Sequence, residues 1–156
     1  MRLHLIAVGP RQPAWVSTAF LDYARRLPAE CRLEVTELPL GPRSKEQDAG
    51  RALNAEAQRM ERTIRPDDWV VALDERGQSW TSRVLAARLE AWMASGRDVA
   101  LLMGGPDGLA PVCKARAHEQ WSLSPLTLPH GLARVVVAEA LYRAHSLLRG
   151  HPYHRD

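Results

Sequence analysis

The sequence predicts an α/β fold, in which a mostly parallel sheet is covered by helices on both faces. Strand-like segments alternate along the chain with helix-like segments, and this alternation is typical of parallel strands joined by crossover helices. The runs "WVVAL" and "VALLM" are apolar throughout, as expected of strands buried on both faces. No linker or low-complexity segment divides the 156 residues, so we expect one domain over residues 1–156.

The chain is expected to begin with a strand, a helix and a second strand. "LHLIAV" (3–8) opens with alternating apolar and polar residues and runs into a turn, which favours a strand over a signal peptide. A helix is predicted over 13–27, because Pro13 suits a first helical turn and Pro28 stops the helix. "RLEVTEL" (32–38) alternates again and predicts the second strand.

Two helices flank a strand in the middle of the chain. A long polar helix is predicted over 45–64, starting at the capping box Ser44-x-x-Gln47. The apolar run at 68–74 predicts a buried strand. A further helix is predicted over 81–95, with Thr81 at its start and Gly96 closing it.

The last part of the chain continues the alternation. A strand is predicted over 98–103 and a short helix after Pro111. "WSLS" and "LTLP", within 121–129, are expected to be short and extended. The final helix is predicted over 132–149.

Three predicted strands end in segments that are suited to a binding site. These ends are Leu73-Asp74-Glu75, Met103-Gly104-Gly105 and Leu123–Pro129. Parallel sheets bind ligands beyond the carboxyl ends of their strands, and sequential strands are often neighbours. We therefore expect the three loops to converge on one pocket.

The residue types in these loops indicate which ligand the pocket accepts. "MGGPDGL" (103–109) matches no phosphate-binding motif and contains no lysine, which disfavours a triphosphate. "SLSPLTLP" offers main-chain groups and the hydroxyls of Ser124 and Thr127 between leucines, which suits a neutral heteroaromatic base. The predicted ligand has an adenine at one end and a sulfonium at the other, because carboxylates nearby would tolerate a cation. Those carboxylates are Asp74, Glu75 and Asp107.

Each loop taken alone also has a structural explanation. A Gly-Gly-Pro turn commonly just ends a strand, and "LDERG" (73–77) on its own predicts a turn with solvated charges. Leu123–Leu128 fits an ordinary core strand equally well. Only the joint position of the three segments at successive strand ends favours a site.

Composition and charge restrict the class of protein. The net charge is +3, and all basic residues but Lys45 and Lys114 are arginine, which permits an RNA partner without requiring one. The distant Cys31 and Cys113 are expected to be reduced thiols of a cytoplasmic protein. No apolar segment is long enough to span a membrane.

The final predicted helix is apolar on more than one face, so we expect it to be covered on two sides by core or by a partner subunit. Glu139 and Arg143 are spaced for a surface ion pair. Arg134 is expected to face solvent, with a substrate contact as the alternative.

The C-terminal tail "HPYHRD" is either without fixed structure or a flap that contacts a substrate. As a flap, Arg155 would contact phosphate, Tyr153 would stack on a base and His154 would titrate near neutral pH. No acidic or thiol ligand accompanies the tail histidines, so a metal site is not expected.

Five ordered motifs resemble the ribosomal RNA large subunit methyltransferase H family, a group of small SPOUT-class enzymes. They are "LD-x-x-G" (73–77), "MGGPDGL" (103–109), "WSLSPLTLPH" (121–130), "RVVVAEALYRA" (134–144) and "HPYHR" (151–155). The resemblance covers essentially the whole chain. It implies a SPOUT-type α/β fold with a deep trefoil knot in the cofactor-binding part, at about 68–156, and a homodimer.

The resemblance also implies an activity and site residues. The activity is methyl transfer from S-adenosylmethionine to N3 of a pseudouridine in a stem-loop of 23S rRNA, on the assembled ribosome. The implied cofactor contacts are Leu73, Gly104, Gly105, Leu123, Ser124, Pro125, Leu126, Thr127 and Leu128. His154 is the leading candidate for the base that accepts the N3 proton, and Tyr153 and Arg155 would position the uridine and its phosphate.

Two other functions remain open from the sequence. A ribosome-associated binding protein without catalysis would use the same basic surface but would not bind S-adenosylmethionine. A doubly wound flavin or nucleotide domain would need a phosphate-binding loop after the first strand, and "VGPRQPAW" is a poor one.

Overall fold

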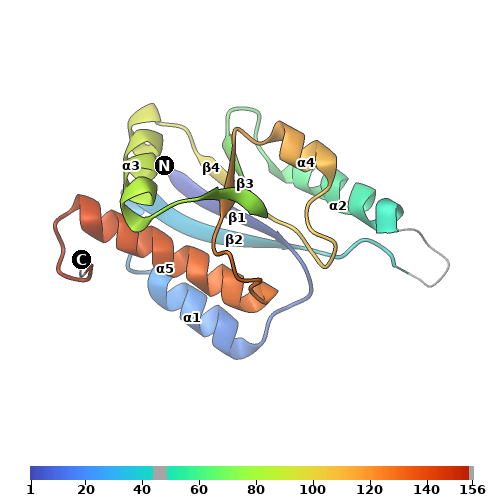
Figure 1. Cartoon of the computed structure of the whole chain (residues 1–156), viewed down its shortest axis with the longest axis horizontal. Helices are drawn as coiled ribbons and strands as arrows, with labels where there is room; N and C mark the ends of the chain where they lie inside the picture. The colour runs from blue at the N-terminus through green and yellow to red at the C-terminus, as the bar shows by residue number, and fades with distance from the viewer. Residues whose placement is uncertain (44–48, 155–156) are drawn as a thin grey trace.

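Five parallel strands form the centre of the computed structural model, which describes residues 1–43 and 49–154 (Figure 1). The strand order is β2-β1-β4-β3-β5. The strands are β1 (Arg2–Val8), β2 (Arg32–Leu38), β3 (Trp69–Ser79), β4 (Val99–Met103) and β5 (Glu119–Ser122). The helices are α1 (Ala14–Ala24), α2 (Ala49–Thr63), α3 (Ser82–Ser95), α4 (Pro111–Arg116) and α5 (His130–Leu148), and a short 3₁₀ turn, η1 (Ala29–Cys31), precedes β2. This arrangement confirms the predicted α/β class.

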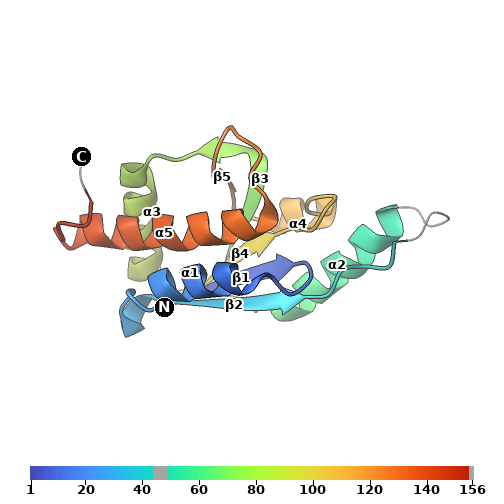
Figure 2. The same cartoon turned by 90° about the horizontal axis from the view of Figure 1, so that it is seen from below.

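Helices cover both faces of the sheet, as Figures 1 and 2 show: α1, α3 and α5 on one face and α2 and α4 on the other. Successive residues of a strand point to opposite faces. Leu5 of β1 accordingly packs in the core beneath α1, α3 and α5, whereas Ile6 packs in the core beneath α2 and α4. Both residues are fully buried, which explains why such strands are apolar without interruption.

Helix boundaries agree with the predictions in part. Thr81 caps α3 by accepting a hydrogen bond from the backbone N–H of Val84, and Gly96 ends this helix with φ of 71°, as predicted. Helix α1 ends three residues early, at Ala24, because the residue before a proline disfavours the helical conformation. Helix α5 begins two residues early, at His130. The predicted helix start at 45 and its capping box lie outside the described residues.

Strand β3 corrects the prediction that "LDERG" is a turn, because the strand continues through it to Ser79. The ladder with β5 shifts register here, so that Trp121 is opposite both Leu73 and Gln78. A Cβ on Gly77 would lie only 2.7 Å from the carbonyl carbon of Gln120. Glycine is therefore needed for the two strands to approach at this position.

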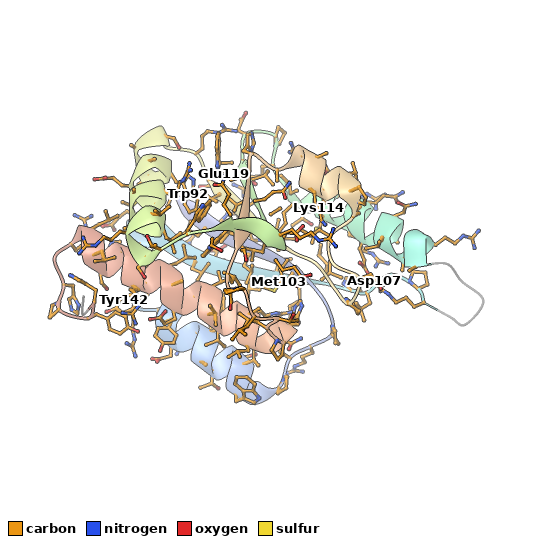
Figure 3. The ribbon with its side chains drawn as sticks, viewed as in Figure 1. Trp92, Met103, Asp107, Lys114, Glu119 and Tyr142 are labelled. Atoms are coloured by element: carbon orange, nitrogen blue, oxygen red, sulfur yellow. The ribbon has the colours of Figure 1, made fainter. Side chains whose placement is uncertain are left out.

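Strand β5 is shorter than the extended segment predicted over 121–129. It begins at Glu119, whose carboxylate accepts hydrogen bonds from the indole N–H groups of Trp69 (2.8 Å) and Trp92 (3.2 Å), as Figure 3 illustrates for Trp92. These bonds hold β5 against β3 and α3. The residues from 123 to 129 form a loop, whose main-chain groups are not used in the ladder.

Both cysteines are free and buried, as expected. Within the described ranges, no helix is long and apolar enough to cross a bilayer.

Candidate functional site

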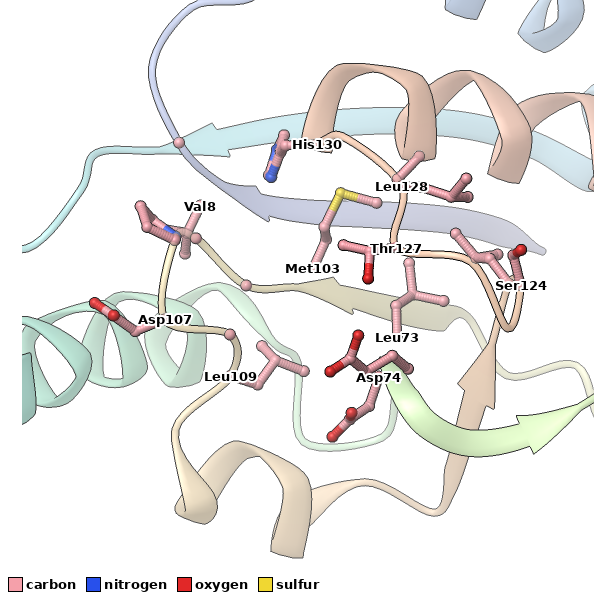
Figure 4. A pocket seen from close by; sticks show the side chains of 18 of the residues that line it. Val8, Leu73, Asp74, Met103, Asp107, Leu109, Ser124, Thr127, Leu128 and His130 are labelled. Carbon is pink, nitrogen blue, oxygen red and sulfur yellow. The ribbon is translucent and has the colours of Figure 1, made fainter.

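A cavity of about 810 Å³ lies at the carboxyl edge of the sheet (Figure 4). Leu73 of β3 pairs with Met103 at the end of β4 and with Trp121 near the end of β5, so the segments that follow these three residues are adjacent. All three loops predicted from the sequence line the cavity, together with the end of β1 and the start of α5. The predicted convergence on one pocket is therefore confirmed.

The glycine loop after β4 (104–108) forms the first wall. The backbone N–H of Gly108 donates to the carbonyl of Gly105 at 3.0 Å, and Gly108 has φ of 75°. A Cβ on Gly104 would lie 2.3 Å from the carbonyl carbon of Gly108. Only glycine fits at position 104, so this wall is formed by main chain rather than by side chains.

The glycine loop is fixed to α2 by Arg43. The guanidinium of Arg43 pairs with Asp107 at 2.9 Å (Nε–Oδ2) and with Glu56 at 2.6 Å (Nη1–Oε1). Glu56 is 3% exposed and also accepts a hydrogen bond from the backbone N–H of Gly41. Asp107, named from the sequence as one of three carboxylates that would tolerate a cation, is thus neutralised by Arg43.

The loop after β5 forms the second wall. The hydroxyl oxygen of Ser124 accepts a hydrogen bond from the backbone N–H of Leu126 at 2.9 Å, which fixes a turn within the loop. Of the six residues predicted to contact a cofactor here, Pro125 alone is absent from the cavity lining, and the other five line it. Leu126 is 73% exposed, which leaves apolar surface available to a ligand.

The part of β3 at which its pairing with β4 ends forms the third wall, with Leu73 and Asp74. Burial alone would raise the pKa of Asp74, but hydrogen bonds from Lys114 and from the backbone N–H of Arg76 outweigh it and lower this pKa. The Asp74 carboxylate is therefore ionised at neutral pH.

Helix α5 contributes His130 to the cavity, opposite Asp74 in Figure 4. Burial and the nearby charge of Arg134 lower the pKa of His130. The prediction that Arg134 faces solvent is wrong: it is 3% exposed, and Nη1 donates to Oε1 of Glu37 at 2.9 Å. Arg134 lies three and seven residues before the buried Val137 and Leu141, on the same face of the helix. This spacing is the sequence signal for its burial.

The Arg134–Glu37 pair provides a test of the described packing. Glu37→Gln leaves the buried guanidinium without its counter-charge, so we expect a loss of about 2 kcal/mol in the free energy of unfolding. Glu34→Gln is the matched control on the same strand, because its nearer partner Arg32 (2.7 Å) is 64% exposed, such pairs contribute little, and its second partner Arg2 lies farther away, at 3.7 Å. Urea denaturation of both variants measures the difference, and equal losses would contradict the burial of Arg134.

The C-terminal tail packs against the far end of α5. The hydroxyl of Tyr153 donates to Oε1 of Glu139 at 3.0 Å, and its ring lies 4.6 Å from the ring of Tyr142. Burial and the bond to Glu139 raise the pKa of Tyr153. The predicted Glu139–Arg143 ion pair is confirmed, with Nε–Oε1 at 2.9 Å.

This position separates the tail from the cavity within one chain. The cavity includes His130 at the start of α5, whereas the tail follows the end of this helix (Figure 1), and its Tyr153 reaches back to Glu139, nine residues or about 14 Å from His130 at 1.5 Å per residue. Neither Tyr153 nor His154 lines the cavity, and Arg155 lies outside the described residues. The roles predicted for these three residues remain predictions.

Solved structures with the same fold are methyltransferases by name. A probable methyltransferase from Bordetella pertussis matches with a TM-score of 0.57 and 18% identity, covering 92% of this chain and 95% of that one. A probable methylase family protein from Haemophilus influenzae matches with a TM-score of 0.53 and 17% identity, covering 99% of this chain and 70% of that one. At these identities the likeness concerns the fold alone.

The sequence defines the class further. Residues 1–154 match the family model described as "Predicted SPOUT methyltransferase". Two relatives named Ribosomal RNA large subunit methyltransferase H match over the full length: that of Thioalkalivibrio sulfidiphilus is 58% identical over 156 residues, covering 100% of both chains, and that of Alkalilimnicola ehrlichii is 55% identical over 155 residues, covering 99% of both. The chain therefore belongs to the ribosomal RNA large subunit methyltransferase H family of SPOUT methyltransferases.

Proposed function

We propose that this methyltransferase transfers a methyl group from S-adenosylmethionine to N3 of a pseudouridine in a stem-loop of 23S rRNA. The observation that carries the proposal is the convergence of three loops on one cavity, in a chain whose full-length relatives are named for the large-subunit rRNA. The target nucleotide is the one that the resemblance of the sequence motifs to this family implies. The assembled ribosome in the cytoplasm is the proposed place of action.

The cavity suits S-adenosylmethionine in size and chemistry. Its volume lies within the range of small-molecule sites, roughly 300–1,000 Å³. The leucines at 123, 126 and 128 provide apolar walls for an adenine, which main-chain groups of that loop outside the ladder can recognise by hydrogen bonds. The absence of a Cβ at Gly104 lets the glycine loop fold back closely on Gly108, and the ionised Asp74 in the cavity wall would compensate positive charge.

The residues of the chain would bind the cofactor, align it with the uridine and exclude water. They would not provide a nucleophile. Bound S-adenosylmethionine supplies a methyl group already activated by the sulfonium. The cavity walls would hold that group in line with N3 of the uridine. His154 would accept the N3 proton, and Tyr153 and Arg155 would hold the target base and its phosphate.

Because the tail lies at the far end of α5 from the cavity of its own chain, we propose that a second copy supplies it. In a symmetric homodimer each tail would then complete the cavity of the partner. This arrangement would make the isolated chain able to bind the cofactor but not to complete the reaction.

The proposed function predicts binding in calorimetry and a modified nucleoside in mass spectrometry. We expect S-adenosylmethionine to bind the purified protein, whereas ATP and flavin mononucleotide do not, because the glycine loop lacks a phosphate cradle. Ribosomes incubated with the protein and S-adenosylmethionine should gain a methyl group on a 23S rRNA pseudouridine. Ribosome binding without any cofactor affinity would instead support a non-catalytic protein.

A further inference from the structure

An ion pair between Asp74 and Lys114 lines the cavity, and its lysine has no place in the function described so far. Nζ of Lys114 lies 2.8 Å from Oδ2 of Asp74. Asp74, labelled in Figure 4, comes from β3, and Lys114, labelled in Figure 3, comes from α4, which follows the glycine loop. Both side chains belong to the wall of the cavity.

Both members of the pair can still bind further groups. A carboxylate accepts about four hydrogen bonds, and Asp74 accepts one from Lys114 and one from the backbone N–H of Arg76 at 3.0 Å. An ammonium has three donors, of which one is directed at Asp74. The Lys114 side chain is 34% exposed and the Asp74 side chain 10% exposed, so the lysine remains accessible.

The negative charge of Asp74 and the positive charge of Lys114 together restrict the kind of ligand that the pair can bind. Asp74 repels an isolated phosphate or carboxylate, and Lys114 repels an isolated ammonium. A group that carries an ammonium and a carboxylate on one carbon atom complements both charges at once. On binding, such a group would replace part of the contact between Asp74 and Lys114 with two charge-assisted hydrogen bonds, one to each of these residues.

We propose that Asp74 and Lys114 bind the α-amino and α-carboxylate groups at the amino-acid end of S-adenosylmethionine. This inference rests on the proposed function and adds a second, charged subsite to the main-chain-lined one. The loop of residues 123–129 after β5 (the leucine loop) would hold the adenine. The Asp74–Lys114 pair would hold the amino-acid end of the same ligand, beside β3. The methyl donor would thereby be fixed at both ends.

Three ligands separate this role from the alternatives. S-adenosylmethionine has the sulfonium and the amino-acid end, S-adenosylhomocysteine has only the amino-acid end, and methylthioadenosine has neither. In calorimetry, Asp74→Asn and Lys114→Met should each weaken the first two ligands to the same extent, by about tenfold or more, since a hydrogen bond to a charged group contributes about 1.5–3 kcal/mol. The affinity for methylthioadenosine should change less than about twofold, which also shows that the variants are folded.

Arg116→Met is the matched control for Lys114→Met. Arg116 lies on the same helix and is similarly exposed, but it pairs with Glu61 of α2 rather than lining the cavity. All three ligands should bind this control as they bind the wild type.

The other outcomes overturn the inference. Weakening of S-adenosylmethionine alone would mean that Asp74 faces the sulfonium, and equal weakening of all three ligands would mean that the pair only holds α4 on β3. Unchanged affinities would mean that the pair does not contact the cofactor. If the wild type bound none of the three ligands, the proposed function itself would fail, and that result is distinct from any loss confined to the variants.

Discussion

Gly104→Ala is expected to weaken the binding of S-adenosylmethionine by roughly 100-fold while leaving the sheet intact. The new Cβ would lie 2.3 Å from the carbonyl carbon of Gly108, where only backbone can move. Overpacking of this kind costs about 3 kcal/mol or more, which corresponds to an affinity loss of roughly 100-fold if the loop must return to its original shape on binding. Calorimetry measures the affinity, and circular dichroism reports whether the fold is retained.

Gly105→Ala is the matched control in the same loop. A Cβ at this position meets only side-chain ends, Leu40 Cδ2 at 3.1 Å and Val8 Cγ1 at 3.2 Å, which can shift by a few tenths of an ångström. We expect a loss of less than about tenfold. Equal effects of the two substitutions, or full affinity in Gly104→Ala, would contradict a binding wall formed by the main chain of residue 104.

His154→Ala is expected to reduce single-turnover methyl transfer by about 100-fold to 10,000-fold, the range of general-base catalysis. The affinity for S-adenosylmethionine should remain that of the wild type, because His154 does not line the cavity of its own chain. Rapid-quench kinetics on ribosomes and calorimetry separate the two quantities. An unchanged single-turnover rate would exclude His154 as the base.

Mixed dimers test where the tail acts. A chain with His154→Ala has an intact cavity, and a chain with Gly104→Ala has an intact tail, so a mixed dimer contains one complete site if tails are exchanged. Each parent is inactive. Random mixing makes half of the dimers mixed, which should restore about a quarter of wild-type activity in a symmetric dimer. No recovery would indicate that each tail acts on its own chain.

The sequence predicted the fold class and most of the site, because both depend on local patterns. Apolar runs and their turns identified the strands, and parallel strands bring their carboxyl ends to one edge. The contacts that were missed are all between distant segments. Continuation of β3 through "LDERG" depends on pairing with β5, and the burial of Arg134 depends on Glu37 from β2.

The charges of the site could not be assigned from sequence for the same reason. Three carboxylates near the pocket were equivalent candidates to face a cation. The structure pairs Asp107 with Arg43, which is 64 residues away, and pairs Asp74 with Lys114 on α4. Only packing of α2 and α4 on the same face of the sheet distinguishes these roles.

A crystal structure of the protein grown with S-adenosylmethionine tests the central claim most directly. We predict that the adenosyl group lies between Leu73, the main chain of Gly104 and the leucine loop after β5, within hydrogen-bond distance of main-chain N–H and C=O groups. Density for the cofactor outside this cavity, or a cavity that stays empty when the cofactor is present in saturating amounts, would contradict it.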